Sequence, residues 1–156
     1  MALETTLVLV KPDGVQRGLV GQILARFEAR GFQILGLKFV KPTRALLEQH
    51  YAAHKERPFY PGLVAFMGSS PVVAVALKGL KAVDVVRKMM GKTSSADAEP
   101  GTIRGDLGLS RSFNLIHGSD SAEAAVKELA LWFKPEELVA YDLTRLAQIL
   151  DLREEG

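Results

Sequence analysis

The segment Asn114–Ser121, NLIHGSDS, places residue types that suit covalent chemistry next to one another. His117 follows an apolar pair and precedes a glycine, and Ser119, Asp120 and Ser121 then lead into a predicted helix. A histidine at the end of a strand and beside a helix N-terminus lies where anions bind well. Because neutral imidazole predominates near neutral pH, such a ring can act as a nucleophile without a strong base.

Other interpretations of this segment and its surroundings stay open at this point. In an arbitrary protein, the pattern is more often a structural histidine followed by a plain helix cap. A Ser-His-Asp triad fits poorly, because close neighbours cannot easily reach the required geometry. GKT at Gly91–Thr93 is not a P-loop, since its first glycine is replaced by Val86. The spacing of His50 and His54 suits a metal on one helix face, but no HExxH glutamate accompanies them.

The elements that must position His117 alternate between strands and helices. Apolar runs rich in β-branched residues predict buried strands at Thr5–Val10, Phe32–Val40, Val72–Leu77 and Asn114–His117. Segments with one apolar face and capping residues predict helices at Leu19–Arg30, Thr43–Tyr51, Pro61–Met67, Leu80–Met90 and Ser121–Phe133. KPDG at Lys11–Gly14 predicts a turn, and Lys92–Phe113 reads as one long irregular stretch of the kind that is usually functional or mobile.

The order of these elements is compatible with two fold classes. Strict alternation favours a parallel, doubly wound sheet, whereas the same order also suits a ferredoxin-like α+β arrangement. No repeat or linker divides the chain, so we expect one domain. Its tail, residues 141–156, carries apolar residues on one side of Leu143–Leu152, which predicts a last amphipathic helix.

The composition is that of an ordinary globular domain. The 156 residues include 20 Lys+Arg and 18 Asp+Glu, and the net charge of +2 is too balanced to indicate a polyanionic partner by itself. Cysteine is absent, which excludes disulfides, thiolate metal sites and a cysteine nucleophile. Because we find neither a secretion signal nor an apolar run long enough to span a membrane, we expect a cytoplasmic protein that makes no membrane contact.

NLIHGSDS resembles the signature of the nucleoside diphosphate kinases. Further blocks resemble the same family in the same order: VKPDGVQRGLVG at 10–21, HY and ERPFYPGLV within 50–64, PGTIRGD at 100–106 and ELALWFKPEEL at 128–138. The resemblance implies a ferredoxin-like α+β fold, βαββαβ, with a four-stranded antiparallel sheet flanked by helices. It also divides the chain into a kinase domain over 1–140 and a C-terminal extension of the same domain over 141–156.

By resemblance, His117 is the nucleophile of a nucleoside diphosphate kinase. Such enzymes transfer a γ-phosphoryl group from a nucleoside triphosphate to a diphosphate in two half-reactions through a phosphohistidine. Position matching makes Glu128 the hydrogen-bond partner of the other imidazole nitrogen, and Tyr51 a neighbour of the ring. Lys11 and Asn114 match residues that bind the ribose 3′-hydroxyl, and Lys11 also approaches the phosphates. The matching phosphate ligands are Arg87, Thr93 and Arg104.

The resemblance also implies the substrates and partners. Phe59 and Leu63 match positions that contact the base, and ring stacking reads no hydrogen-bonding edge, so broad base specificity is expected. Mg²⁺ would be carried by the phosphates of ribo- and deoxynucleotides, without a metal site on the protein. Ser119 matches a supporting serine, but Ala53 stands where an acidic partner is common. We expect a homo-oligomer, with a hexamer favoured over a tetramer or dimer. The second hypothesis, a regulatory or nucleic-acid-binding protein of the same fold, finds no basic excess in this sequence, so nucleic acid is not expected as a partner.

Overall fold

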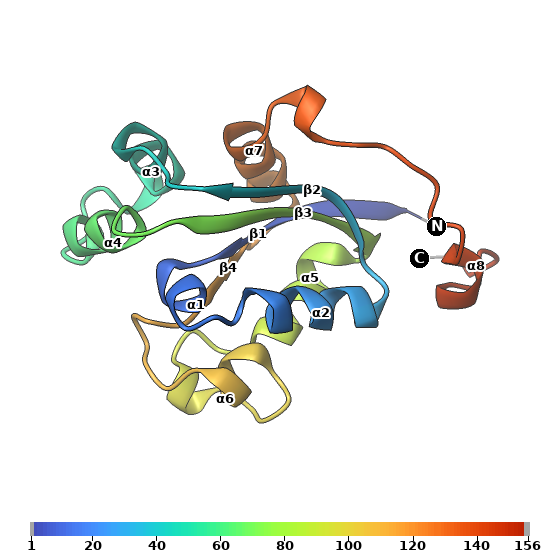
Figure 1. Ribbon diagram of the computed structural model, residues 1–156, viewed down its shortest axis with the longest axis horizontal. Helices are drawn as coiled ribbons and strands as arrows, with labels where there is room; N and C mark the ends of the chain where they lie inside the picture. Colours follow the sequence, from blue (N-terminus) through green and yellow to red (C-terminus); the bar gives the residue numbers. More distant parts are fainter. Residues whose placement is uncertain (1, 155–156) are drawn as a thin grey trace.

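The computed structural model describes residues 2–154 and is built around one four-stranded sheet (Figure 1). Its strands are β1 Leu3–Val10, β2 Gln33–Val40, β3 Val72–Leu80 and β4 Ile116–Gly118. They are ordered β2-β3-β1-β4, and each neighbouring pair is antiparallel. This order excludes the parallel doubly wound alternative and confirms the expected ferredoxin-like α+β fold.

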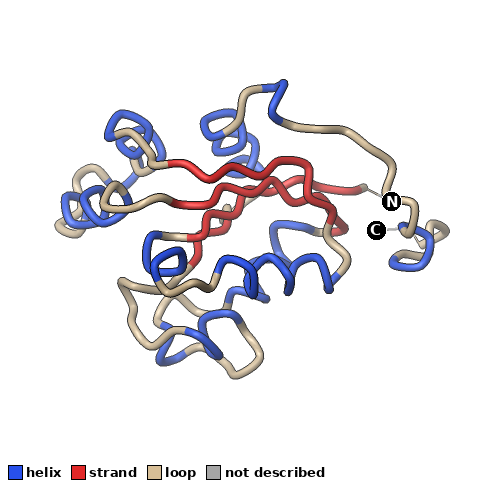
Figure 2. Tube along the Cα trace, viewed as in Figure 1, coloured by secondary structure: helices blue, strands red, loops and turns tan. Residues whose placement is uncertain are grey.

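Helices cover both faces of the sheet (Figure 2). One face packs against α2 and α5, with α1 and α6 beside them, and the other packs against α3, α4 and α7. The bounds of these helices are α1 Pro12–Gln16, α2 Val20–Arg30, α3 Arg44–His50, α4 Tyr60–Met67, α5 Ala82–Met90, α6 Ile103–Leu107 and α7 Ala122–Trp132. Short 3-10 turns are η1 Ala52–His54, η2 Ser95–Asp97 and η3 Pro135–Glu137.

Strand β1 is buried on both of its faces. Leu7 and Leu9 point into the core under α3, α4 and α7, whereas Val8 and Val10 point into the core over α2 and α5. Successive strand side chains face opposite sides of a sheet, so a central strand covered twice must be apolar throughout. This explains the uninterrupted run TTLVLV and brings the end of β1 to the middle of the molecule.

Local signals placed several helix ends correctly. The Thr43 hydroxyl accepts a hydrogen bond from the backbone N–H of Leu46, at 3.2 Å, and caps α3. Ser121 caps α7 in the same way, accepting from the N–H of Ala124 at 3.0 Å. Helix α2 ends at Gly31, whose φ of +109° places it in the left-handed region that glycine adopts without a steric penalty.

Two predicted irregular segments contain helices instead. KPDG is not a turn: Pro12 opens α1, because proline lacks the N–H that the first helical position does not need. The stretch Lys92–Phe113 contains η2 and α6, and the Thr102 hydroxyl caps α6 by accepting from the N–H of Gly105 at 2.9 Å. Helices of three to five residues are too short for an apolar periodicity to reveal them.

The last strand is shifted relative to the prediction of Asn114–His117. Leu115 has φ of +73°, outside the extended region, so pairing with β1 begins only at Ile116. The N–H of Leu115 donates to the Asp13 carboxylate at 3.0 Å, and its carbonyl accepts from the N–H of Lys11 at 2.8 Å. These two bonds fix the chain on both sides of the positive φ and join β4 to the start of α1.

The C-terminal tail packs back onto β2 and α2. Tyr141 donates from its hydroxyl to the Ile34 carbonyl at 3.0 Å, and its own carbonyl accepts from the Gln33 side chain at 2.7 Å. Helix α8 spans only Leu146–Ile149, so the predicted helix over Leu143–Leu152 is too long. These tertiary contacts, rather than a continuous amphipathic helix, hold the tail in place. Among residues 2–154, no helix has the length and apolar character needed to cross a membrane.

Candidate active site

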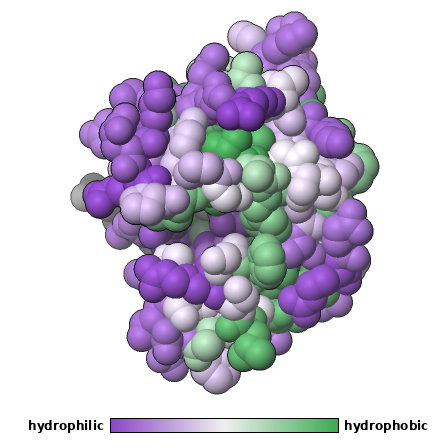
Figure 3. All heavy atoms as spheres, turned by 90° about the vertical axis from the view of Figure 1, so that its left-hand side faces the viewer, coloured by the Kyte–Doolittle hydropathy of each residue, from purple (hydrophilic) through white to green (hydrophobic). Residues whose placement is uncertain are grey.

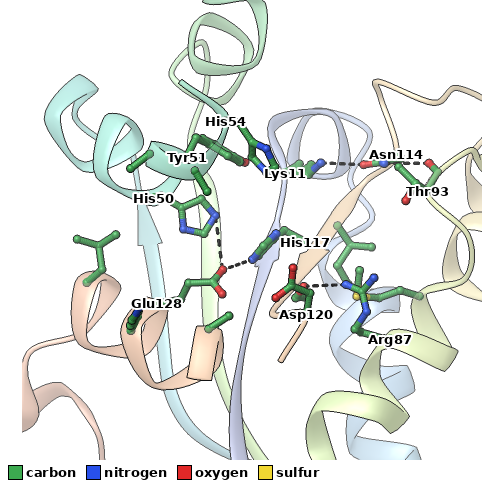
Figure 4. A pocket seen from close by; sticks show the side chains of 18 of the residues that line it. Lys11, His50, Tyr51, His54, Arg87, Thr93, Asn114, His117, Asp120 and Glu128 are labelled. Atoms are coloured by element: carbon green, nitrogen blue, oxygen red, sulfur yellow. Dashed lines mark hydrogen bonds and ion pairs between the residues drawn. The ribbon is translucent and has the colours of Figure 1, made fainter. Parts of the chain in front are cut away.

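A cleft of about 620 Å³ opens where the ends of β1 and β4 meet α3, α5 and α7. Its volume is in the range of sites that bind small molecules. Figure 3 shows the face of the molecule that lies at the left of Figure 1, with polar side chains visible inside a hollow. Figure 4 shows that charged and aromatic side chains from elements far apart in the sequence converge there.

His117 lies on β4 opposite Leu9, with its side chain 23% exposed in the cleft. Its Nε2 forms a short hydrogen bond with the Oε1 atom of Glu128, which projects from α7 (Figure 4). Burial raises the pKa of the Glu128 carboxyl, but the bond with His117 and the nearby imidazoles lower it more, so its pKa lies below the usual value. The carboxylate therefore accepts the Nε2 proton, and the lone pair of the neutral ring is left on Nδ1.

A second imidazole lies beside this pair. The His50 ring is T-shaped to that of His117, with centroids 4.7 Å apart, and its Nε2 is 3.7 Å from Glu128 Oε1. Burial, followed by the charge of His117, lowers the pKa of His50 to about 3. His50 is therefore neutral at neutral pH.

These three side chains offer ligand atoms within 4.8 Å of one another and are a possible metal cluster by position alone. Their hydrogen bonds oppose that use. His117 Nε2 is engaged by Glu128, and Trp132 donates to His50 Nδ1 at 3.0 Å, which leaves the proton of that neutral ring on Nε2. A metal would have to displace both protons, since histidine binds metals through a deprotonated nitrogen.

Lys11 and Asn114 form the polar floor of the cleft. Lys11 Nζ donates to Asn114 Oδ1 at 2.8 Å, and Asn114 Nδ2 donates to the Thr93 carbonyl at 3.0 Å. Lys11 is only 8% exposed. Burial and, next, the charge of Arg104 lower its pKa to about 8, and the opposing effect of Asp13 is smaller, so the ammonium carries a desolvation cost. An anionic ligand would relieve that cost.

Two arginines border the same side of the cleft. Arg104 is buried and donates to three backbone carbonyls, those of Asn114, Gly91 and Ile116, at 3.1, 3.0 and 2.7 Å. Burial and then Arg87 lower its pKa to about 10, so it stays charged. Arg87 makes a longer bond of 3.3 Å to the Gly118 carbonyl. Arg104 thus ties the loop after α5 to β4 while adding positive charge to the cleft.

Tyr51 lines the cleft next to His50, with ring centroids 4.6 Å apart. Burial and the Glu128 charge raise the pKa of its hydroxyl well above the usual value, so it remains protonated and can only donate or accept hydrogen bonds. Within residues 2–154 this buried hydroxyl has no hydrogen-bond partner. It is available to a ligand.

Comparison with known proteins agrees with this geometry. The model of the family described as nucleoside diphosphate kinase matches residues 4–138. The nucleoside diphosphate kinase of Synechococcus elongatus is 57% identical over 136 residues, 87% of this chain and 91% of its own, and that of Gallus gallus is 56% identical over 138 residues, 88% and 90%. The chain belongs to the nucleoside diphosphate kinase family. Solved structures agree: the halophilic enzyme of Halobacterium salinarum in complex with CDP has a TM-score of 0.93 at 46% identity, covering 96% of this chain and 99% of its own. The chain is therefore a nucleotide-binding phosphotransferase.

Most of the residues that the family resemblance assigned do line one cleft. They are Lys11, Tyr51, Arg87, Thr93, Arg104, Asn114, His117 and Glu128. Phe59 and Leu63 are not among the lining residues: Phe59 is 54% exposed, with its ring centroid 5.5 Å from that of His54, which does line the cleft, and Leu63 packs against the core under α3, α4 and α7. That these two residues contact the base stays a prediction.

Ser119 is buried beside Glu128, and its hydroxyl contributes to the lowered pKa of that carboxyl. It makes no hydrogen bond of normal geometry within the described residues. The alanine at position 53 also lines the cleft and offers no acidic group there. A supporting role for Ser119 therefore stays a prediction.

Sequence reasoning missed several kinase-family side chains that face or support the cleft. The sequence analysis gives His50 and Trp132 no role beyond their family blocks, apart from the rejected metal pair of His50 and His54. A signal for Trp132 existed, because it follows Glu128 by four residues and so shares its helix face. Asp120 and Lys127 also line the cleft; both flank residues that the motif had already singled out.

Proposed function

We propose that this chain transfers the γ-phosphoryl group of a nucleoside triphosphate to a nucleoside diphosphate in two steps through a phosphohistidine on Nδ1 of His117. The observation that carries the proposal is the bond between His117 Nε2 and Glu128, which leaves the Nδ1 lone pair free in a cationic cleft. Covalent catalysis of this kind lets one pocket serve donor and acceptor in turn.

In the first step, the Nδ1 lone pair attacks the γ-phosphorus. An N–P bond forms, the bond between that phosphorus and the bridging oxygen breaks, and the diphosphate leaves with the electron pair on its terminal oxygen. The Nε2 proton stays on the ring, where Glu128 balances the positive charge that develops on the imidazole. The second step reverses these changes with a terminal oxygen of the acceptor diphosphate as the nucleophile.

The cations of the cleft supply most of the remaining stabilisation. Phosphoryl transfer depends chiefly on positioning and on neutralising charge at the phosphate oxygens. In the proposed complex, Arg87, Thr93 and Arg104 hold the phosphates, and Lys11 and Asn114 hold the ribose 3′-hydroxyl, with Lys11 also facing the phosphates. The low pKa of Lys11 supports this role, because burial and the charge of Arg104 outweigh the effect of Asp13 and an anionic ligand would offset them.

The residues of the cleft fit Mg²⁺ that arrives with the nucleotide. Of the carboxylates lining it in residues 2–154, Glu128 is held by the histidines, whereas Asp120 is exposed. Mg²⁺ keeps several waters and binds substrate phosphates rather than an all-protein cage, so the nucleotide would carry the ion without a metal site on the protein. The ion would neutralise charge on the transferring group.

Broad base specificity is the next part of the proposal. Phe59 next to His54 offers a ring face that stacks on any base and reads no hydrogen-bonding edge. The base would have to reach the rim formed by Phe59 and Leu63. Similar kcat/KM values for ADP, GDP, CDP and UDP are expected, and a strong preference for one of them would contradict this part.

We also propose that the protein is a cytoplasmic homo-oligomer, with a hexamer favoured. Edge strand β2 exposes Leu37 by 53% and Phe39 by 68%, which supports a protein interface there. Sedimentation velocity at micromolar concentration decides the assembly, and cell fractionation decides the location.

One labelling experiment tests the mechanism. The protein is incubated with γ-labelled ATP and Mg²⁺ without acceptor, and an acid-labile, base-stable label should appear on the protein. A nucleoside diphosphate should then remove it, and chelation of Mg²⁺ should prevent it. His117→Ala should take up no label, whereas the matched variant His54→Ala should. An unlabelled wild type, or equal labelling of His117→Ala, refutes the proposal.

A further inference from the structure

His50 and Trp132 form a second layer behind the reacting pair. The His50 side chain is 1% exposed and packs between the rings of His117, Tyr51 and Trp132, each in a T-shaped arrangement. Trp132 is also buried and is not among the residues that line the cleft. Neither residue has a role in the two-step mechanism. His50 nevertheless approaches Glu128, and Trp132 contacts His50.

The contact between these two side chains sets the tautomer of His50. An indole N–H can only donate, and Trp132 Nε1 donates to His50 Nδ1 at 3.0 Å. That nitrogen must therefore carry a lone pair, and the single proton of the neutral ring lies on Nε2. Any protonation of His50 on Nδ1 would place two N–H groups against each other in a buried site.

The protonated Nε2 of His50 faces the oxygen that His117 also uses. The distance from His50 Nε2 to Glu128 Oε1 is 3.7 Å, which is longer than a normal hydrogen bond. Catalytic hydrogen bonds are often long before the substrate binds and tighten in the reacting complex. With the opposite tautomer, a lone pair would face the carboxylate and repel it.

We infer, on the basis of the proposed function, that Trp132 and His50 are positioning residues: Trp132 fixes the tautomer of His50, and the His50 Nε2–H holds the Glu128 carboxylate against Nε2 of His117. The path runs from α7 to the end of α3, back to α7 and on to β4. Figure 4 shows its last three side chains, those of His50, Glu128 and His117. It ties the orientation of the carboxylate to the packing of two helices instead of to one flexible side chain.

Other charges also act on His50 and belong in any pH analysis. They are His117 on β4, Glu128 on α7, Lys11 after β1 and His54 on the same segment. Glu128 favours a proton on the His50 ring, whereas His117, Lys11 and His54 oppose it. The variants described next leave all four of these groups in place.

Three substitutions separate positioning from packing. Trp132→Phe keeps an aromatic ring and removes the N–H. His50→Phe keeps a ring and removes both nitrogens, whereas His50→Gln retains an acceptor for Trp132 and a donor for Glu128. Ile23→Val, in the core on the other face of the sheet, controls for a general loss of stability.

The readouts are the rate of His117 phosphorylation across pH, kcat and KM, and ¹⁵N chemical shifts of the histidines. In Trp132→Phe and His50→Phe, kcat is expected to fall about three- to tenfold, the loss of one weak polar contact in the transition state, with KM unchanged. The acidic limb should move to higher pH, because Glu128 loses a donor. His50→Gln should recover most of kcat, and Ile23→Val should match the wild type.

The wild-type spectrum decides the matter independently of whether the variants fold. It should show His50 neutral at neutral pH, with its proton on Nε2. A proton on Nδ1, or a wild-type kcat and acidic limb in both Trp132→Phe and His50→Phe, overturns the positioning role. If the wild type takes up label at His117 while these variants are normal, only this inference is wrong; if the wild type takes up no label, the proposed function itself is wrong.

Discussion

Arg104 offers the sharpest test of how this site is built, because one side chain both charges the cleft and holds its walls together. Its guanidinium donates to three carbonyls, two on the segment that leads through β4 and one at the end of α5. A hydrogen bond to a charged group contributes about 1.5–3 kcal/mol, so the three bonds together contribute about 5–9 kcal/mol. Burial works against the charge and lowers the pKa of Arg104 to about 10, which offsets about 3 kcal/mol.

Arg104→Met should therefore lower the free energy of unfolding by about 2–6 kcal/mol. The measurement is urea unfolding followed by tryptophan fluorescence, since Trp132, the single tryptophan, is buried in the core. Arg87→Met is the matched control: Arg87 makes one bond of 3.3 Å, so we expect a loss of under about 1 kcal/mol. Both variants should lose phosphotransfer activity. If Arg104→Met is as stable as Arg87→Met, the carbonyl contacts do not hold the loop and Arg104 acts on the ligand alone.

Three further predictions follow from single features of the structure. Because the pKa of Lys11 is lowered to about 8, the ammonium loses its charge above that pH, and kcat/KM should fall on the basic side of the pH profile. Lys11→Arg should move this basic limb to higher pH. A limb that does not move would show that another group titrates. Gly31→Ala should lower the free energy of unfolding in urea by about 1–2 kcal/mol, since φ is +109° and a Cβ would overlap Ile149. The control Gly21→Ala, in open space on α2, should raise that free energy by about 0.5–1 kcal/mol. Deleting residues 141–156 should leave the labelling rate unchanged, because none of the described residues 141–154 lines the cleft. The deletion should lower the unfolding midpoint, because the Tyr141 hydrogen bonds are lost. A lower labelling rate would assign the tail a part in the site.

Features that depend on close neighbours in the chain were predictable. The uninterrupted apolar run of β1, the hydroxyl caps of α3 and α7 and the glycine after α2 each involve residues close together in the chain. Short helices such as α1 and α6 could not be predicted from the sequence, because five residues hold too little periodicity to identify. The positive φ of Leu115 could not be predicted for another reason: its hydrogen-bond partners are Asp13 and Lys11, about a hundred residues away.

The same distinction between local and long-range information applies to the candidate site. The motif around His117 and the family blocks predicted a nucleophile, its carboxylate partner and the cations, and the structure brings these residues to one cleft. They could not show that Phe59 and Leu63 do not line this cleft, that burial lowers the pKa of Lys11, or that Trp132 contacts His50. Each of these features depends on packing between residues that are far apart in the sequence.

The sequence by itself therefore determined the family and most of the long elements, and it proposed His117 as the nucleophile. Only the tertiary structure decided the sheet order and the contacts around His117. The physical reason is that strand periodicity and capping are set by local backbone and side-chain geometry, whereas pairing partners and burial depend on the whole packed chain. His50 and Trp132, 82 residues apart in the sequence and 3.0 Å apart in the fold, have no local pattern that requires them to meet.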